Sequence, residues 1–223
     1  MVILYYLFVK IYGLMIILIS PFNSKASKWV KGRRNIFKKI SDSLHNDKSP
    51  KIWIHCSSFG EFEQGKPLIE ALRSNFPDNK IIATFFSPSG YEYKKNDKAL
   101  DYVFYLPLDG PVNSRKFVEL IKPVAVFFVK YEFWHFYIRE LKHKHIPCYS
   151  VSSIFRPSQL YFKWYGKFFK NILQRMSMIF VQDQKSLELL YNASITHVTV
   201  SGDRKSTRLN SSHVSESRMP SSA

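Results

Sequence analysis

Two glutamates follow strand-like segments, where they could act on a bound substrate. Glu61 comes after a short apolar run and the turn SSFG, and Glu132 comes after the continuous apolar run 124–129. A carboxylate in a crevice can accept the proton of a substrate hydroxyl, and a second carboxylate nearby increases its affinity for that proton. A structural explanation exists for each glutamate. Ser58–Glu61 fits the S-x-x-E capping box, and the helix dipole favours an acid such as Glu132 near a helix start. Finding both after strands favours a functional site.

The elements that must position these glutamates alternate between strand-like and helix-like segments. Strands are expected at 51–57, 80–87, 101–106, 124–131, 147–152, 178–182 and 197–201, and helices at 62–75, 112–121, 133–145, 160–176 and 184–192. This alternation predicts a doubly wound parallel sheet covered by helices, the α/β class.

Ligands of such sheets bind beyond the carboxyl ends of the strands, where the strand order reverses, commonly between the first and fourth strands. Glu61 and Glu132 are therefore predicted to lie in one crevice, with Ser58, Gly60 and Lys130 beside them as substrate-binding residues. The turn lacks the G-x-G-x-x-G fingerprint, and a carboxylate repels phosphate. This part of the chain is therefore not expected to hold a nucleotide. The sequence shows no metal-ligand cluster.

The N-terminal 20 residues are almost entirely apolar and long enough to cross a bilayer. Seven basic residues and no acid follow in 21–39, so the positive-inside rule keeps the rest of the chain in the cytoplasm. We predict a membrane anchor at 1–22, spanning or monotopic, and a basic juxtamembrane segment at 23–50. Lys10 is unfavourable at the centre of a bilayer, and a buried core helix is the alternative.

A net charge of +16 favours an anionic partner. Arg156, Lys163, Lys167 and Lys170 lie in the aromatic-rich stretch 154–182, which contains no acid. Such mixtures suit anionic lipid headgroups or single-stranded nucleic acid, and a core helix with solvent-reaching lysines is the structural alternative. Because of the apolar N-terminus, we predict a membrane or acceptor surface here and no nucleic-acid partner.

Several segments, in order over about residues 1–202, resemble the 3-deoxy-D-manno-octulosonic acid (Kdo) transferase family of lipopolysaccharide synthesis. They are KWVKGRRN, WIHCSSFGEFEQGKPLIEAL, TFFSPSGYE, YLPLDGPVNSRKF, KPVAVFFVKYEFW, IPCYSVSS and FVQDQKSLELL. The resemblance implies the N-terminal half of a two-domain GT-B glycosyltransferase on the cytoplasmic face of the inner membrane. In such an enzyme the Rossmann-like half, here 51–202, receives lipid A or its precursor.

The resemblance also implies an inverting, metal-independent transfer that needs no cofactor beyond the donor substrate CMP-Kdo. It makes Glu61 the base on the acceptor hydroxyl and Glu132 a second glutamate of the site. Around Arg156 the chain departs from the family, because VSSIFR stands where many relatives have a run like N-A-R-x-S.

The family's donor-binding C-terminal domain is expected to be absent, which would leave this chain inactive alone. Residues 203–223 have no apolar periodicity and are expected to be disordered. Their runs DRKSTRLNSSH and SRMPSSA match the translation of a common sequencing adapter, so we expect this tail to be an assembly artefact. Two other functions remain open: a different membrane-bound GT-B glycosyltransferase, and a non-enzymatic module that binds anionic lipid.

Overall fold

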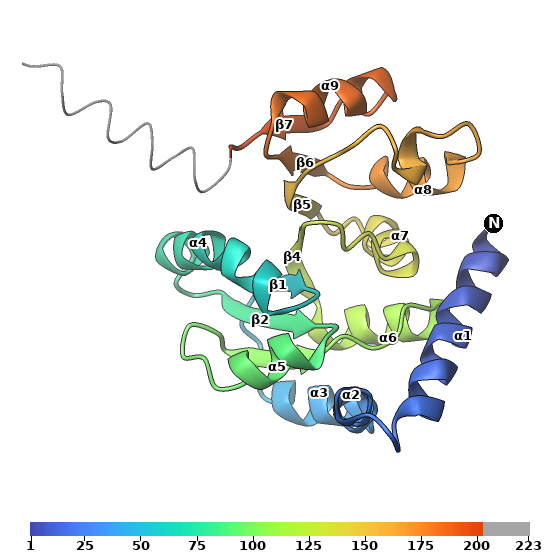
Figure 1. The fold of residues 1–223 in the computed structure, drawn as a ribbon. Helices are drawn as coiled ribbons and strands as arrows, with labels where there is room; N and C mark the ends of the chain where they lie inside the picture. Colours follow the sequence, from blue (N-terminus) through green and yellow to red (C-terminus); the bar gives the residue numbers. More distant parts are fainter. Residues whose placement is uncertain (203–223) are drawn as a thin grey trace, which may run out of the picture.

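The computed structural model describes residues 1–202, which contain a seven-stranded sheet of order β3-β2-β1-β4-β5-β6-β7 (Figure 1). The strands are β1 (Lys51–Cys56), β2 (Lys80–Phe85), β3 (Tyr102–Tyr105), β4 (Pro123–Val129), β5 (Cys148–Ser153), β6 (Met178–Val181) and β7 (Val198–Val200). Every neighbouring pair is parallel. The predicted Rossmann-like, doubly wound sheet is thereby confirmed, and its strand order reverses between β1 and β4 as expected.

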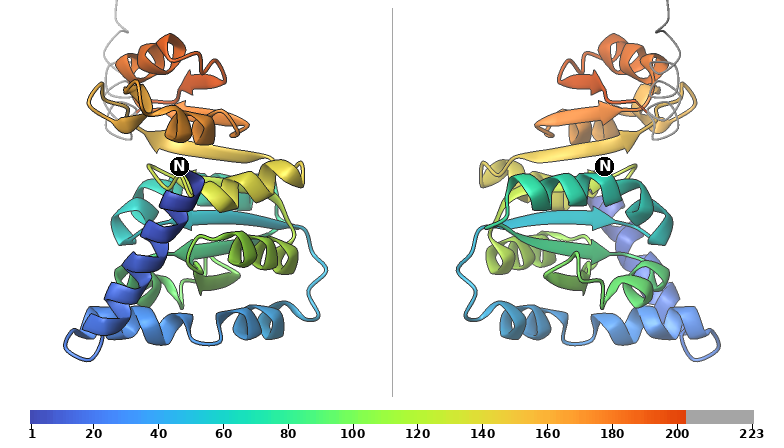
Figure 2. Two further views of the ribbon diagram at one scale, coloured as in Figure 1. Left: turned by 90° about the vertical axis from the view of Figure 1, so that its right-hand side faces the viewer. Right: turned by 90° about the vertical axis from the view of Figure 1, so that its left-hand side faces the viewer.

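Helices pack against both faces of the sheet (Figures 1 and 2). They are α4 (Phe59–Asn75), α5 (Pro88–Lys94), α6 (Pro111–Ile121), α7 (His135–His143), α8 (Lys167–Leu173) and α9 (Gln184–Asn192). All six residues of β1 are buried, and they alternate between two cores. Trp53 packs with residues of α6 and α7, whereas Ile52 and Ile54 pack with residues of α4. Burial on both faces explains why the central strands are continuously apolar.

The continuous helix predicted over 160–176 is wrong. The short 3₁₀ helix η1 (Leu160–Phe162) and α8 are separated by a chain reversal that ends at Gly166. A Cβ atom at Gly166 would lie 1.7 Å from the carbonyl oxygen of Leu160, so this close approach requires glycine. The pattern of apolar residues did not reveal the reversal, because lysines and aromatics continue through it.

Two further helices, α2 (Ser24–Arg33) and α3 (Ile36–Leu44), occupy the segment expected to be a basic juxtamembrane region. Ile36, Ile40 and Leu44 of α3 recur every fourth residue and join the core that contains α6. In α2, Arg33 reaches the ends of two strands: its Nε donates to the Leu106 carbonyl at 2.9 Å and its Nη2 to the Phe86 carbonyl at 2.8 Å. Helices α2 and α3 therefore pack as parts of the folded domain.

We expect Arg33→Ala to lower the free energy of unfolding by about 3 kcal/mol, because it leaves two carbonyl groups without their charged donor. The substitution also removes the guanidinium from the face of Trp29, 3.9 Å from the ring centroid. Arg34 is exposed, and Arg34→Ala is the matched control, with an expected change within about 0.5 kcal/mol. Urea denaturation of both variants measures the difference. Equal stabilities would contradict a structural role for Arg33.

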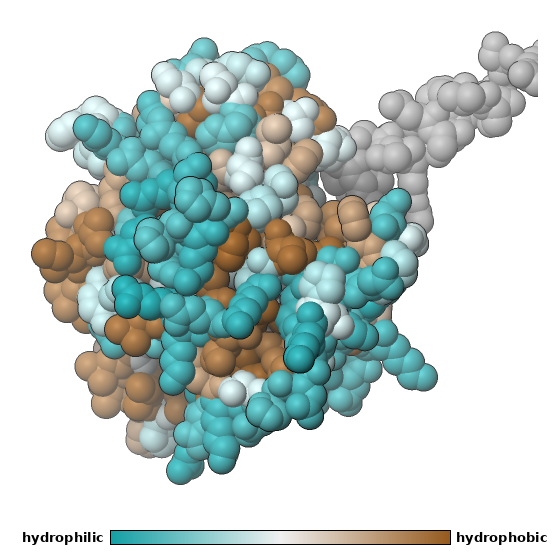
Figure 3. All heavy atoms as spheres, turned by 180° about the vertical axis from the view of Figure 1, so that it is seen from behind, coloured by the Kyte–Doolittle hydropathy of each residue, from teal (hydrophilic) through white to brown (hydrophobic). Residues whose placement is uncertain are grey.

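Helix α1 (Val2–Ile19) is long and apolar enough to cross a membrane, by length and composition, and 11% of it is buried. Its buried residues Val9 and Gly13 lie on the side that docks on the domain, and a Cβ at Gly13 would lie 2.6 Å from Leu108 Cδ1. Its other side exposes large apolar residues: Ile3, Leu4, Leu7, Ile11, Leu14, Met15 and Leu18. Figure 3 shows hydrophobic residues gathered along this edge of the molecule. Helix α1 is thus docked on one side and apolar on the other.

Candidate active site

Glu61 lies in the first turn of α4, directly beyond the carboxyl end of β1. The expected capping box is present: the Ser58 backbone N–H donates to Glu61 Oε2 at 2.8 Å, and the Ser58 hydroxyl donates to the same oxygen. Within residues 1–202 no hydrogen bond engages Glu61 Oε1. One carboxylate oxygen is therefore held by the helix start, and the other remains available for a substrate hydroxyl. The capping role does not exclude a catalytic one.

Lys130 directly follows β4, and its backbone conformation turns the chain toward the carboxyl end of β1. Its φ of 64° is in the left-handed region, its N–H donates to the Val151 carbonyl at 2.8 Å, and its own carbonyl accepts from the Ser153 hydroxyl at 2.9 Å. No hydrogen bond or ion pair of the Lys130 side chain occurs within the described residues. Lys130 therefore acts through its backbone, placing Glu132 two residues later beside β1.

Glu132 is fixed by two side chains that the sequence analysis did not single out. Its Oε2 lies 3.2 Å from Nε2 of His55, a fully buried residue of β1, and it accepts from the Trp134 indole N–H at 2.9 Å. His55 is held from its other side by Thr84 of β2, whose hydroxyl and carbonyl oxygens lie 2.8 and 3.1 Å from Nδ1. The contacts His55–Glu132 and Glu132–Trp134 thus link β1 to the β4–α7 connection across the switch point.

The hydrogen-bond partners of His55 fit either tautomer of its ring. The Thr84 hydroxyl accepts from the Trp53 indole N–H and can donate its own hydrogen to Nδ1, or Nδ1 can donate to the Thr84 carbonyl. On the other side, Nε2 can donate to Glu132 Oε2 or accept from the Trp134 indole, whose single hydrogen lies within reach of both. In either tautomer His55 has a partner on both sides of its ring.

Both glutamates act electrostatically on one buried group. Cys56 is the last residue of β1, and its free thiol is fully buried. Burial raises the pKa of this thiol, and the nearby charges of Glu61 and Glu132 raise it further. The structure therefore brings the two predicted glutamates to the same edge of the sheet, on either side of the switch point.

A cavity of about 470 Å³ opens above Glu132. It is lined by residues of α1 and of the loops after β1, β2, β3 and β4: Tyr5, Phe8, Val9, Tyr12, Ser57, Phe86, Leu108, Tyr131, Glu132, Phe133 and Trp134. The polar groups lie at the carboxyl ends of the strands, and α1 supplies an apolar wall. The cavity thus lies at the switch point of the strand order, with Glu132 among its lining residues and Glu61 outside them.

Asp109, in the β3–α6 connection, ties α1 to the start of α7. Its two carboxylate oxygens accept from the Phe136 and Tyr137 backbone N–H groups at 3.0 and 3.1 Å, and Oδ2 also accepts from the Tyr5 hydroxyl at 2.7 Å. Burial raises the pKa of Asp109 to about 6 despite these three donors. His135, packed edge to face on Tyr5, has its pKa lowered to about 4 by burial and by the charges of Arg175 and Arg139.

Asp109 and His135 give opposite pH dependences of stability. Between pH 4 and 6 the folded state binds a proton at Asp109 more tightly than the unfolded chain, so this contribution to stability falls as pH rises. At His135 the unfolded chain binds the proton more tightly up to about pH 6.5, so this contribution rises with pH. In Asp109→Asn only the contribution of His135 remains. We therefore expect the free energy of unfolding of this variant to rise by about 2 kcal/mol between pH 4 and 6.5. Thermal denaturation across this range measures it, and parallel profiles for variant and parent would contradict it.

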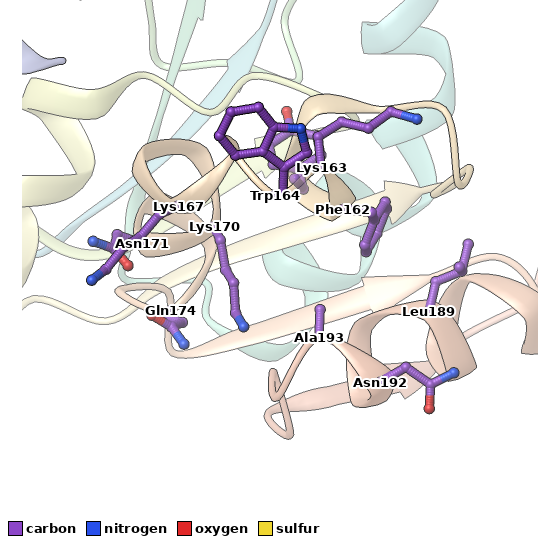
Figure 4. Close-up of a pocket in the computed structure, with 11 residues that line it drawn as sticks. Phe162, Lys163, Trp164, Lys167, Lys170, Asn171, Gln174, Leu189, Asn192 and Ala193 are labelled. Carbon is purple, nitrogen blue, oxygen red and sulfur yellow. The ribbon is translucent and has the colours of Figure 1, made fainter.

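A second cavity, of about 570 Å³, lies between η1, α8 and α9 (Figure 4). Lys163, Lys167 and Lys170 line it together with Trp164, whose side chain is 94% exposed. Three of the four predicted basic surface residues thus meet around one pocket. Arg156 is exposed but is not among the lining residues. Tyr161 of this pocket packs on Phe133 of the first cavity, with ring centroids 5.7 Å apart, so the two cavities are neighbours.

The other predicted residues, Ser58, Gly60 and Lys130, lie just beyond the carboxyl ends of β1 and β4 but are not among the residues that line the cavity above Glu132. Ser58 is the N-cap of α4, and Gly60 is exposed in its first turn, where an added Cβ would meet nothing closer than 3.9 Å. The sequence analysis missed His55, Trp134 and Asp109 as site residues. A histidine inside an apolar central strand was the one available signal, because such a buried polar group requires partners. Within residues 1–202, no group of three or more His, Cys, Asp or Glu residues could hold a metal ion.

Comparison with known proteins adds a family to this geometry. Residues 30–208 match the model of the 3-deoxy-D-manno-octulosonic-acid transferase (kdotransferase) family. The chain belongs to this family. Within it, the chain is 38% identical over 94 residues to the 3-deoxy-D-manno-octulosonic acid transferase of Aquifex aeolicus, which covers 42% of this chain and 26% of that protein. It is 33% identical over 99 residues to the enzyme of the same name from Haemophilus influenzae, and this alignment covers 43% of this chain and 23% of that protein.

The chain thus aligns with about a quarter of the length of these curated relatives. Among solved structures, a putative UDP-N-acetylglucosamine 2-epimerase from Listeria monocytogenes superposes with a TM-score of 0.53 at 12% identity. This match covers 77% of this chain and 50% of the epimerase. At that identity the likeness concerns the fold alone, and it agrees with a Rossmann-like domain.

Proposed function

We propose that this chain is the acceptor-binding half of an enzyme that transfers Kdo from CMP-Kdo to lipid A or its precursor. The observation that carries the proposal is the placement of Glu61 at the carboxyl end of β1. It stands across the switch point from Glu132, which is held by His55 and lines a cavity partly walled by α1. Family membership supplies the chemistry of the donor, and the cavity supplies a place for the acceptor hydroxyl.

In this mechanism Glu61 accepts the proton of the acceptor hydroxyl. The oxygen forms a bond to the anomeric carbon of Kdo from the face opposite CMP, and the bond from that carbon to the phosphate oxygen breaks. CMP leaves with the electron pair, and the anomeric configuration inverts. Glu132, held through Oε2 by His55 and Trp134, can bind an acceptor hydroxyl through its other carboxylate oxygen. No step assigns a role to a metal ion.

We further propose that the enzyme works on the cytoplasmic face of the inner membrane. The apolar outer side of α1 fits the acyl region of a bilayer, and the pocket with Lys163, Lys167 and Lys170 fits anionic headgroups or acceptor phosphates. Because α1 docks along the domain, a monotopic position in the membrane surface is favoured over a span. The net charge of +16 agrees with an anionic membrane and a phosphorylated acceptor.

The test is transfer by the complete protein, including the donor-binding half implied by the family. CMP-Kdo labelled in the sugar is incubated with the tetra-acylated lipid A precursor in anionic vesicles, and labelled lipid is the expected product. Transfer only from another sugar nucleotide would instead favour a different membrane-bound GT-B glycosyltransferase. Vesicle binding without transfer from any donor would favour a lipid-binding module. The predicted adapter-derived tail, 203–223, lies outside the described residues and is removed before the assay.

A further inference from the structure

Helix α1 does more than offer an apolar surface, because it encloses the space above Glu132. Tyr5, Phe8, Val9 and Tyr12 contribute one wall of the 470 Å³ cavity whose opposite side contains Glu132. An anchor that served only to tether the domain would not need to line this cavity. The position of α1 therefore connects the membrane-facing surface with the candidate catalytic residues.

The cavity has a polar end and an apolar end. Ser57 and Glu132 lie beyond the carboxyl ends of the strands and can hydrogen-bond a hydroxylated group. Phe8 and Leu108 lie toward α1 and offer apolar contacts. A ligand that matches both ends has a hydroxylated head and a hydrocarbon chain.

The apolar end continues into the outer surface of α1. Phe8 lines the cavity and is also 67% exposed, and Leu4, one turn earlier, is 61% exposed. With the outer side of α1 in a bilayer, a hydrocarbon chain could reach the cavity without first entering water. Such continuous apolar contact favours partial extraction of a lipid over its transfer through solvent.

The wall is held in place by specific contacts. The Tyr5 hydroxyl bonds to Asp109, which also accepts from two backbone N–H groups at the start of α7. Tyr12 packs on Phe86 with ring centroids 6.0 Å apart. A wall fixed at two points about two turns apart can position a ligand, because it loses little conformational freedom on binding.

We propose that α1 forms the acyl-chain wall of the acceptor site, with an acyl chain of the lipid acceptor lying against Phe8 while its sugar hydroxyl faces Glu132. This inference rests on the proposed function, since the occupant is the acceptor of that reaction. It deepens that function by assigning acceptor selection to the N-terminal helix. An acceptor without acyl chains would leave this wall unused.

The experiment compares Phe8→Ala with Leu7→Ala in the complete protein. Leu7 neighbours Phe8 on α1 and is 52% exposed, but it does not line the cavity. KM is measured for the tetra-acylated acceptor and for the same disaccharide bisphosphate without acyl chains, both in detergent micelles. We expect Phe8→Ala to raise KM for the acylated acceptor about tenfold, because an aromatic contact is lost, and to leave KM for the deacylated acceptor unchanged.

Leu7→Ala is expected to change neither KM, and co-sedimentation with vesicles is expected to fall similarly for both variants. Equal KM values for Phe8→Ala and Leu7→Ala with the acylated acceptor would overturn the inference while leaving the transferase activity standing. Absence of transfer by the parent protein would instead overturn the proposed function. Phe8 is exposed, so loss of folding is not expected, and circular dichroism of both variants checks this.

Discussion

Glu61→Gln in the complete protein is expected to lower the rate of Kdo transfer about 10³-fold while leaving the fold and its stability intact, because a general base contributes rate rather than structure. Glutamine cannot accept the hydroxyl proton. It can, however, still accept the Ser58 backbone N–H through its amide oxygen, and glutamine serves as well as glutamate in a capping box. The substitution thus removes the proposed chemistry and keeps the local structure. The rate is measured as turnover at saturating acceptor, and stability as the urea midpoint.

Glu61→Ala is the companion variant, because it removes both the base and the cap. It should lose turnover to the same extent and also lose about 1 kcal/mol of stability. If Glu61→Gln turned over at the parent rate, Glu61 would be a capping residue alone, and the base would have to be sought elsewhere. Comparing the two variants therefore separates two explanations that the spacing S-x-x-E leaves open.

His55→Ala is expected to lower the free energy of unfolding by about 3 kcal/mol, because it leaves a largely buried carboxylate without its partner. The Glu132 side chain is only 15% exposed, and the Trp134 indole would be its remaining donor. Glu132→Gln is expected to change stability by less than about 1 kcal/mol. Its amide oxygen can accept from Trp134, and its NH₂ can donate to His55 Nε2.

Denaturation of His55→Ala, Glu132→Gln and the double variant measures the coupling between the two residues. NMR of the ¹⁵N-labelled histidine ring shows which ring nitrogen carries hydrogen, and an Nε2–H that donates to Glu132 is expected in the parent chain. Its absence, or a Glu132→Gln variant as unstable as His55→Ala, would contradict the pairing of His55 with Glu132. A matched check is Glu140→Gln, a buried carboxylate of α7 whose partner is the partly exposed Lys144, and it should leave the His55 signal unchanged.

The two glutamates differ in what holds them. Glu132 Oε2 lies against His55 of β1 and accepts from the Trp134 indole, whereas the partner of Glu61 within residues 1–202 is Ser58 at the helix start. From the sequence, Glu132 was expected to act on Glu61 as a second negative charge, and the histidine beside it was not expected. The different surroundings fit different roles, with Glu61 as the base and Glu132 as a residue that positions the acceptor.

Much of the fold could be predicted because local patterns carry it. The run 124–129 is continuously apolar, as expected of β4, which lies between β1 and β5, and each predicted strand is present to within a few residues. The capping box at Ser58 needed only four residues of sequence, and it formed. The reversal of strand order between β1 and β4 followed from the alternation of strands and helices. In each case the information lies within one element or in the order of elements.

The tertiary structure alone decided which side chains meet. His55 and Glu132 are separated by 77 residues, and Tyr5 and Asp109 by 104, so neither contact leaves a local pattern in the sequence. Likewise, Gly166 breaks a helical pattern only because Leu160 folds back against it. Periodicity reports how each segment divides between core and surface. Hydrogen bonds between distant segments depend on the sheet order and on the docking of α1, which are fixed only when the whole chain packs.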